Sequence, residues 1–414
     1  MDLAPKMLAL IDTLFLFFSI IVAFSALIGF SIYESGLITA KNASSIIAKK
    51  IGALSVSALL FLAIAYRLMF ATDSEGAAVF PFLDAAWTWK LWRYSADKGE
   101  TLAHFYSNFT FQWLFAALNI VIIAGAVVER MRLFGFLLFT VVMSGFIYPI
   151  VGHWVWNTGF LYRAGFSDFA GASVVHLTAA CAGLSGTLML GSRMGKYTLT
   201  KHPLSIRGSN LPLAALGALF IWLGFLGLNC GAELSFSHLK DADNVMTILV
   251  STLMAGSGGL IAALLFSRIL FSKTDLTLML NGLISGLVAI SANPIIVHME
   301  VTPLLGAAAA LISMLLIFIL ERLRVDDPVG VVSVHGGGAL VGLLAVPLFD
   351  KDISFSIQLI GVLVIGIFTF TVTGLVWWLV KLLMGLRISE ADEIAGLDVV
   401  DCGLEAYPEF IKTR

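Results

Sequence analysis

The chain alternates between long apolar runs and short polar breaks. A membrane-spanning helix needs about 20 apolar residues, because each residue advances the helix by about 1.5 Å across a hydrocarbon core of about 30 Å. Eleven runs approach or exceed this length, and each predicts a spanning helix. They cover residues 7–32, 46–69, 103–128, 133–150, 171–190, 212–231, 245–271, 276–292, 301–320, 330–348 and 355–384. The predicted fold class is an all-α membrane protein with eleven transmembrane helices.

Composition agrees with this prediction. Apolar residues make up 59% of the chain and charged residues 13%, whereas a soluble domain carries about 25% charged residues. The formal net charge is −2 and no basic cluster is present, so nucleic acid is not an expected partner. The first apolar run is too long for a cleaved signal peptide. We expect it to be retained as the first helix of a multi-pass protein of the cell membrane.

Basic residues predict the orientation, because cytoplasmic loops of membrane proteins are enriched in Lys and Arg. With the N-terminus outside, 17 of the 25 basic residues fall on the inner side. We therefore predict an N-out, C-in topology. The outer segment 70–102 contains Trp87, Trp89 and Trp92, which is typical of an interfacial aromatic belt. Residues 1–386 are predicted to form the transmembrane domain, and residues 387–414 a cytoplasmic tail.

One polar motif occurs twice at the start of an apolar run. Asp168 is followed by Gly171 at +3 and His176 at +8, and the same offsets lead from Asp327 to Gly330 and His335. A single His in an apolar helix is usually a core residue with satisfied hydrogen bonds. Two at matched offsets are harder to attribute to chance, and ionisable groups within membrane spans usually mark an ion or proton path. The repeat therefore predicts a paired imidazole site.

The positions of the two motifs predict an inverted repeat. One opens the fifth span and the other the tenth, so they enter the membrane from opposite sides, as in transporters built from inverted halves. The halves are about 7–190 and 212–348, and span 355–384 is additional. Each His lies eight residues into its helix, about 12 Å deep. The two imidazoles can then meet near the midplane of the membrane.

Imidazoles in an apolar path suit a small polar molecule or a proton. Neutral imidazole both donates and accepts hydrogen bonds and can pass a proton along. A zinc site is a weaker alternative, because neither His has a carboxylate beside it and no third His or Cys stands at ligand spacing. The sequence has no nucleophile or cofactor motif, so we predict neither an enzyme nor a cofactor.

The residues around both motifs resemble the Amt/Mep/Rh ammonium transporter family, and in particular its Amt branch. The likeness covers nearly the whole chain in the expected order. Its segments are Gly29-Phe30, Glu34-Ser35-Gly36-Leu37, Lys41-Asn42, Phe111-Gln112, Phe115-Ala116, Tyr148-Pro149, His153-Trp154-Val155-Trp156, Asp168-Phe169-Ala170-Gly171, Val174-Val175-His176, Val325-Asp326-Asp327-Pro328 and His335-Gly336.

This resemblance implies roles for individual residues. His176 and His335 correspond to the twin-His pair of the family's pore. Trp156 corresponds to the aromatic that binds the cation at the outer mouth, and Asp168 to a buried aspartate that supports the site without touching substrate. Phe111 corresponds to an aromatic of the outer vestibule and Phe115 to one of two stacked gate rings. Without the resemblance, core packing or lipid contact explains these rings equally well, and Asp168 is explained as a helix N-cap.

The sequence departs from the family at the outer mouth. The aromatic-rich run Trp-Phe-Gly-Phe-Asn-x-Gly-Ser of the family is replaced by a run from Phe225 to Ala232. Phe225 stands for the Trp, Leu228 for the second gate Phe and Ala232 for the Ser hydroxyl of the recruitment site. The tail run from Asp401 to Tyr407 also differs from the family pattern, which bears on control by a PII-type regulator.

The predicted function is transport of ammonium, or methylammonium as its analogue, across the bilayer. Ammonium is recruited at the outer aromatic site and deprotonated, and ammonia and the proton pass the twin His. The resemblance implies a homotrimer with one pore per subunit. The alternative is an ammonium sensor that binds ammonium with little transport and acts on a signalling output domain or regulator at the tail. A gas channel of the Rh kind is a third hypothesis, which the segment from His153 to Trp156 disfavours.

Overall fold

The computed structural model describes residues 3–70, 101–198 and 202–408. The predicted outer aromatic cluster at Trp87, Trp89 and Trp92 lies outside the described residues, as do the last six residues of the predicted tail. Within the described ranges the structure is helical and contains isolated bridges but no β-strand. The predicted all-α class is confirmed.

Within the described residues, the long apolar helices match the predicted spans in number and order. The first five spans are α1 (Leu3–Leu37), α2 (Ala43–Leu60) continued by η2 (Phe61–Ala65) and α3 (Tyr66–Phe70), α5 (Leu102–Ala126), α6 (Leu133–Val142) continued by η4 (Met143–Ile147) and α7 (Tyr148–Trp156), and η5 (Ala172–Leu177) continued by α9 (Thr178–Leu190). The other six are α10 (Leu211–Gly231), α11 (Leu239–Phe271), α12 (Leu276–Ile290), α13 (Thr302–Leu323), η6 (Val331–Gly336) continued by α14 (Gly337–Phe349), and α15 (Phe355–Met384). Ten of these are long and apolar enough to span a membrane, and α12 is a shorter apolar helix of 15 residues.

Some predicted spans were too short, because the helices extend beyond the apolar runs from which they were predicted. The predicted seventh span began at residue 245, but α11 begins at Leu239. Its first turn is polar and is closed by a capping box in which the Asp241 carboxylate accepts from the His238 amide at 3.0 Å. Such a box satisfies amides that have no partner within the helix. The helix therefore starts where its cap lies and not where the apolar residues begin.

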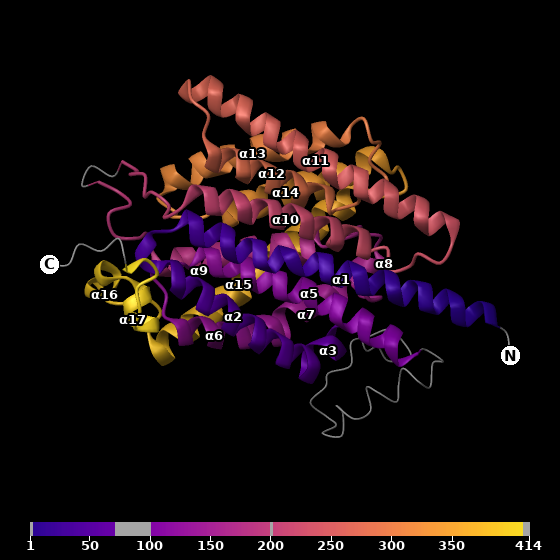
Figure 1. Cartoon of the computed structure of the whole chain (residues 1–414), viewed down its shortest axis with the longest axis horizontal. Helices are drawn as coiled ribbons and strands as arrows, with labels where there is room; N and C mark the ends of the chain where they lie inside the picture. Colours follow the sequence, from indigo (N-terminus) through magenta and orange to yellow (C-terminus); the bar gives the residue numbers. More distant parts are fainter. Residues whose placement is uncertain (1–2, 71–100, 199–201, 409–414) are drawn as a thin grey trace.

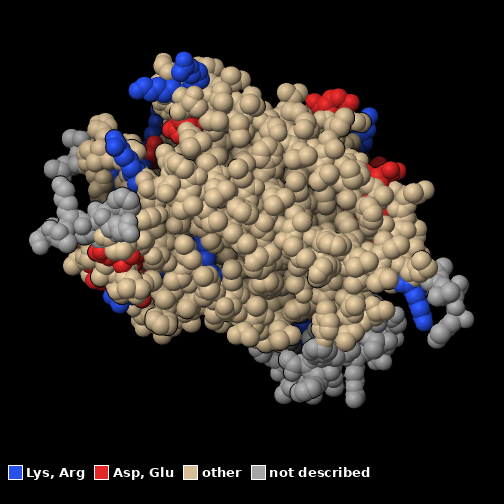
Figure 2. All heavy atoms as spheres, in the orientation of Figure 1, with Lys and Arg blue, Asp and Glu red and all other residues tan. Residues whose placement is uncertain are grey.

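The long helices run roughly side by side along the longest axis of the molecule (Figure 1). Helix α1 begins at one end of this axis, and the short tail helices α16 (Glu390–Ala395) and α17 (Leu397–Cys402) lie at the other. On the face drawn in Figure 2, charged side chains gather mainly towards the two ends, and a broad uncharged band lies between them. This distribution fits a protein whose middle lies in hydrocarbon.

Helices α1 and α10 lie in direct backbone contact. A Cβ atom on Gly29 or Gly36 of α1 would lie 2.5 Å from the Ile221 amide nitrogen or the Asn210 carbonyl oxygen, respectively. Only glycine fits such an approach, because any side chain would force the two helices apart. This contact brings Phe30 of α1 and Phe225 of α10 to the same region of the interior.

The tail is docked on the start of α2. The Asp398 carboxylate accepts from the amides of Ser44 at 3.1 Å and Ser45 at 2.7 Å. A carboxylate is favourable at a helix N-terminus because free amides and the positive end of the helix dipole meet there. The Lys49 ammonium lies 3.5 Å from the Asp401 carboxylate. These contacts hold the tail against the helices.

Candidate functional site

The two imidazoles meet in the interior. The Nδ1 atoms of His176 in η5 and His335 in η6 lie 3.1 Å apart, and the rings are stacked with centroids 5.0 Å apart. Both residues are buried, at 1% and 3% exposure. The predicted contact between the two rings is therefore confirmed. Two neutral imidazoles that share one Nδ1–H must be opposite tautomers, so one Nε2 is left as a donor and the other as an acceptor.

Each motif adopts the same backbone conformation. Gly171 and Gly330 have φ angles of 92° and 79°, a region that favours glycine. Each is followed by a π-helical turn that carries the His, and such turns are frequent at functional sites. The buried Asn119 amide donates to the Val175 carbonyl in the first turn at 2.8 Å. Asn119 was not predicted, since a single Asn in an apolar helix gives no distinctive signal.

Asp168 holds the first motif in place with five hydrogen bonds. Oδ1 accepts from the amides of Gly171 and Ala172 at 3.0 and 2.8 Å. Oδ2 accepts from the Ser173 amide at 2.7 Å, the Ser173 hydroxyl at 2.6 Å and the Val174 amide at 3.1 Å. Burial raises the pKa of Asp168, and these hydrogen bonds oppose the rise. The carboxylate thus fixes the turn that presents His176.

Three predicted aromatics form one cluster above the first motif. The Phe111 and Phe115 rings of α5 meet edge to face with centroids 5.2 Å apart. Trp156, at the end of α7, lies 5.4 Å from Phe115. The Trp156 indole N–H donates to the Asp168 carbonyl at 2.7 Å, which orients the indole over the motif. The electron-rich faces of such rings can attract a cation.

Phe225 lies beside the imidazoles and not at the outer mouth, so its predicted grouping with the outer residues is corrected. Its ring stacks on His176 with centroids 5.4 Å apart and an interplanar angle of 11°. Phe30 lies on the opposite side, 5.5 Å from His335. The four rings form a row in the order Phe225, His176, His335 and Phe30, hereafter the ring row. Phe30 belongs to the segments of the resemblance, but no role had been predicted for it.

The other two residues predicted at the mouth lie on the last turn of α10. Leu228 is buried at 3% exposure and belongs to the same core cluster as Phe111 and Phe115. Ala232 is the C-cap of α10 and is half-buried. The alanine side chain has no polar atom, so position 232 offers no side-chain hydrogen-bond acceptor to a cation.

The second motif borders a cavity of about 400 Å³, hereafter the inner cavity, which Asp327, Val329 and Asn281 help to line. The Tyr33 hydroxyl donates to the Asn281 side chain at 2.5 Å. Asp327 Oδ2 accepts from the amide and hydroxyl of Ser333, both at 3.0 Å, while its buried Oδ1 has no hydrogen-bond partner among the described residues. The second motif therefore borders a polar space, and one buried acceptor of Asp327 lies beside it.

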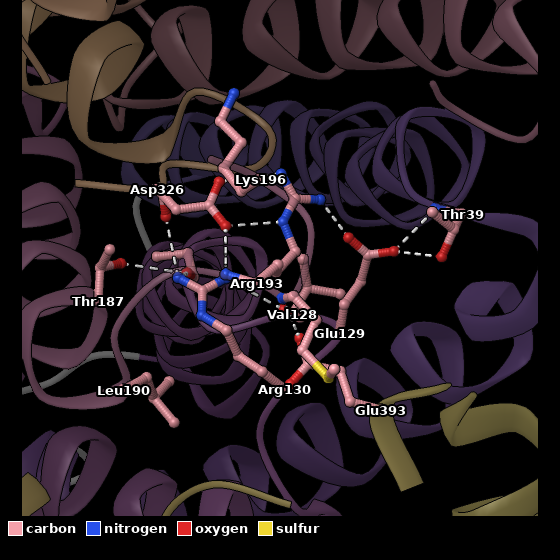
Figure 3. A network of polar contacts seen from close by, with 12 residues as sticks. Thr39, Val128, Glu129, Arg130, Thr187, Leu190, Arg193, Lys196, Asp326 and Glu393 are labelled. Atoms are coloured by element: carbon pink, nitrogen blue, oxygen red, sulfur yellow. Dashed lines mark hydrogen bonds and ion pairs between the residues drawn. The ribbon is translucent and has the colours of Figure 1, made fainter. Parts of the chain in front are cut away.

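A buried charge network fixes the loops at this end of the molecule (Figure 3). Arg193 approaches both oxygens of Asp326, with its Nε at 2.8 Å from Oδ2 and its Nη2 at 3.0 Å from Oδ1, and also pairs with Glu129. Arg130 donates to the Asp326 carbonyl at 2.9 Å. Burial alone would raise the pKa of Asp326, but the hydrogen bonds and charge of Arg193 lower it to about 2. The network anchors the residue that precedes Asp327.

Among the described residues, no group of three or more His, Cys, Asp and Glu side chains is placed to hold a metal ion. Taken together, the apolar helices and the buried imidazole pair define a multi-pass membrane protein with a polar site in its interior.

Comparison with known proteins identifies the family. The model of the Ammonium Transporter Family matches residues 13–407, and the chain belongs to this family. A putative ammonium transporter of Synechocystis sp. is 34% identical over 416 residues, covering 94% of this chain and 73% of the relative. The ammonium transporter Amt2 of Archaeoglobus fulgidus is 31% identical over 416 residues, covering 93% and 86%. These relatives are named as transporters and not as enzymes, in agreement with the prediction.

Solved structures share the fold. A sensor Amt protein superposes with a TM-score of 0.86 at 29% identity, covering 96% of this chain and 99% of that one. Mep2 of Candida albicans superposes with a TM-score of 0.80 at 23% identity, covering 97% and 92%. The chain is thus a multi-pass membrane protein of the cell membrane with the Amt/Mep fold.

Proposed function

We propose that the chain conducts ammonium across the membrane as ammonia and a proton. The observation that carries this proposal is the imidazole pair, placed between an aromatic cluster and a polar cavity. Ammonium is attracted to the Trp156 and Phe115 rings and loses its water there. A bare charge in an apolar site costs several kcal/mol or more, which favours loss of a proton from the dehydrated ammonium. It then gives up a proton, and neutral ammonia passes the apolar ring row.

The imidazoles carry the proton separately. Because His176 and His335 share one hydrogen bond, a proton arriving on one free Nε2 can be matched by release of a proton from the other. Asp168 takes part by fixing the turn that holds His176 and not by contact with ammonium. We further propose an N-out, C-in orientation, in which the aromatic cluster faces outwards, and a homotrimer with one pathway per subunit.

The test is a current recording on purified protein reconstituted into a lipid bilayer. Addition of ammonium should produce a steady current, and His176→Ala should abolish it. Control recordings use protein-free vesicles and sodium in place of ammonium. Binding of ammonium without any steady current in the unmodified protein would contradict the proposal.

A second candidate function is ammonium sensing. It is favoured by the likeness to a sensor Amt protein and by the apolar Leu228 and Ala232 at the outer mouth. An altered mouth would bind ammonium differently and pass little of it. The docked tail would then carry the signal to an output domain or a PII-type regulator. Current recordings separate the two functions, because a sensor gives binding without steady current.

Position 232 gives a graded test of the outer mouth. A hydroxyl there would add a hydrogen bond to the cation, typically worth about 1.5–3 kcal/mol. In a transporter, Ala232→Ser should therefore lower the ammonium concentration at half-maximal current by about tenfold or more. Ala232→Val, which adds size without a hydroxyl, is the matched control. An unchanged half-saturation in Ala232→Ser would place the recruitment site elsewhere.

A further inference from the structure

A buried ion pair lies between α1 and α2 beside the ring row. The Lys50 ammonium is 2.8 Å from the Glu34 carboxylate, and the two side chains are 0% and 1% exposed. The same ammonium donates to the Phe30 carbonyl at 2.8 Å. Replacing such a pair by apolar residues is often neutral or stabilising, because desolvation of both charges is costly. Stability of the fold therefore does not explain it, and charges within membrane spans usually have a functional role.

The pair is oriented along the pathway. Lys50 is bonded to the backbone of Phe30, whose ring lies 5.5 Å from His335, and its charge acts on that imidazole. Glu34 lies one turn further along α1. A Cβ on Gly125 would lie 2.6 Å from the Glu34 carboxylate and 2.7 Å from a methyl group of Val329, which lines the inner cavity. The positive end of the pair therefore lies towards the imidazoles, and the negative end lies near Val329 at the edge of the inner cavity.

Other polar groups reinforce this polarity. Asp327, with its unpartnered Oδ1, lines the inner cavity and acts electrostatically on Glu34. The hydroxyl of Tyr33, adjacent to Glu34, donates to the Asn281 side-chain oxygen at 2.5 Å. The cavity itself is lined by the acids Asp275, Glu321 and Asp327 and by two bases, Arg193 and Lys196, which are paired with acids. Glu34 lies near Val329 of this lining, whereas Lys50 is a fixed cation near His335. Lys50 therefore disfavours a mobile cation beside the ring row, and Asp327, which makes no ion pair among the described residues, favours one at the cavity.

We propose that Lys50 and Glu34 are selectivity residues of this pathway. The proposal rests on the transport function proposed above. Lys50 repels an intact cation at His335, so that nitrogen passes as neutral ammonia. Glu34 and Asp327 stabilise ammonium at the inner cavity, where the lone pair of ammonia forms an N–H bond with the proton that the imidazoles have carried. Potassium, which has no proton to lose, is stopped at the ring row.

The test compares potassium with ammonium. Unmodified protein, the neutral double variant Glu34→Gln/Lys50→Gln and the control Lys49→Gln are reconstituted into vesicles, and currents driven by each cation are recorded. Lys49 is the neighbouring lysine on the same helix, but it pairs with Asp401 of the tail. The neutral double variant should raise the ratio of potassium to ammonium current by about tenfold, because Lys50 acts on His335 and the loss of its charge is only partly offset by the loss of Glu34. Lys49→Gln should keep the ratio of the unmodified protein.

Two other results would contradict the proposals. A folded double variant with an unchanged ratio would overturn the proposal, because a structural role affects total current and not the ratio. Lys50→Gln alone, in which Glu34 can take up a proton, repeats the test if the double variant does not fold, and an unchanged ratio there has the same meaning. An absence of ammonium current in the unmodified protein would instead refute the proposed function, and the selectivity role with it.

Discussion

The two copies of the repeated motif share a backbone but differ in how their acids are bound. Asp168 has both carboxylate oxygens occupied by five hydrogen bonds. Asp327 receives two from Ser333 and keeps one oxygen, beside the inner cavity, without a partner among the described residues. The carboxylate of the first copy is therefore fully used by its own turn, whereas that of the second keeps one buried oxygen available. The repeated sequence gives both copies the same backbone conformation. The residues packed around each copy decide whether its carboxylate has an oxygen left for other partners.

The largest expected effect comes from exchanging each acid for its amide. Asp168→Asn places an NH₂ group against backbone donors and removes charge-assisted hydrogen bonds, each worth about 1.5–3 kcal/mol. We expect a loss of about 4 kcal/mol in the free energy of unfolding and loss of current. Asp327→Asn can keep the oxygen that faces Ser333 and turn its NH₂ towards the cavity, so its loss should be below about 1 kcal/mol. Denaturant unfolding in detergent measures both, and equal losses would contradict the comparison.

The residue before each acid gives a pH-dependent difference. The second copy has Asp326 there, paired with Arg193, whereas the first copy has the neutral Ser167. Because the folded pKa of Asp326 is about 2 and its ordinary value is 3.8, the pairing stabilises the fold above pH 4. This contribution, about 2 kcal/mol, should be lost as the pH falls from about 4 to 2. Unfolding curves at several pH values should show this loss, and Asp326→Asn should lack it.

The smallest expected difference is between the two glycines. Gly171→Ala and Gly330→Ala each force a side chain into the left-handed region, at a cost of about 1–2 kcal/mol. The added Cβ would lie 2.8 Å from a methyl group of Val175 in one copy and 3.0 Å from one of Val334 in the other. We expect similar losses of stability, because this part of the motif is common to both copies. Losses that differ by more than about 1 kcal/mol would show that the backbones are not equivalent.

Hydrophobic patterning predicted the spans well because length and polarity alone decide what crosses a membrane. The last span was predicted at 355–384 and is found at Phe355–Met384. Helix starts were predicted less well, since α11 depends on its cap. Matched offsets were enough to predict that His176 and His335 meet. This worked because an imidazole pair has few other ways to be satisfied within hydrocarbon.

The rest of the site depends on contacts between helices that a linear sequence does not reveal. Phe225 was grouped with Ala232, but seven residues separate them, a rise of about 10 Å along α10. One therefore lies at the ring row and the other at the helix end. Phe30, Asn119 and Lys50 have ordinary neighbours in sequence and acquire their places only through packing against η5, η6 and α1. The proposed roles of the site residues remain predictions to be tested by the currents described above.

The glycine contact between α1 and α10 bears on how quickly the proposed pathway can conduct. Because backbone touches backbone at Gly29 and Gly36, neither helix can tilt or slide without collision. Phe30 of α1 and Phe225 of α10, at the two ends of the ring row, are therefore carried by helices whose separation is fixed. Rotation of exposed side chains takes picoseconds to nanoseconds, whereas collective rearrangement of domains takes microseconds to milliseconds. If the helices do not move, side-chain rotation and not collective rearrangement limits conduction. The conduction rate should then resemble that of a pore more than that of a rocking carrier.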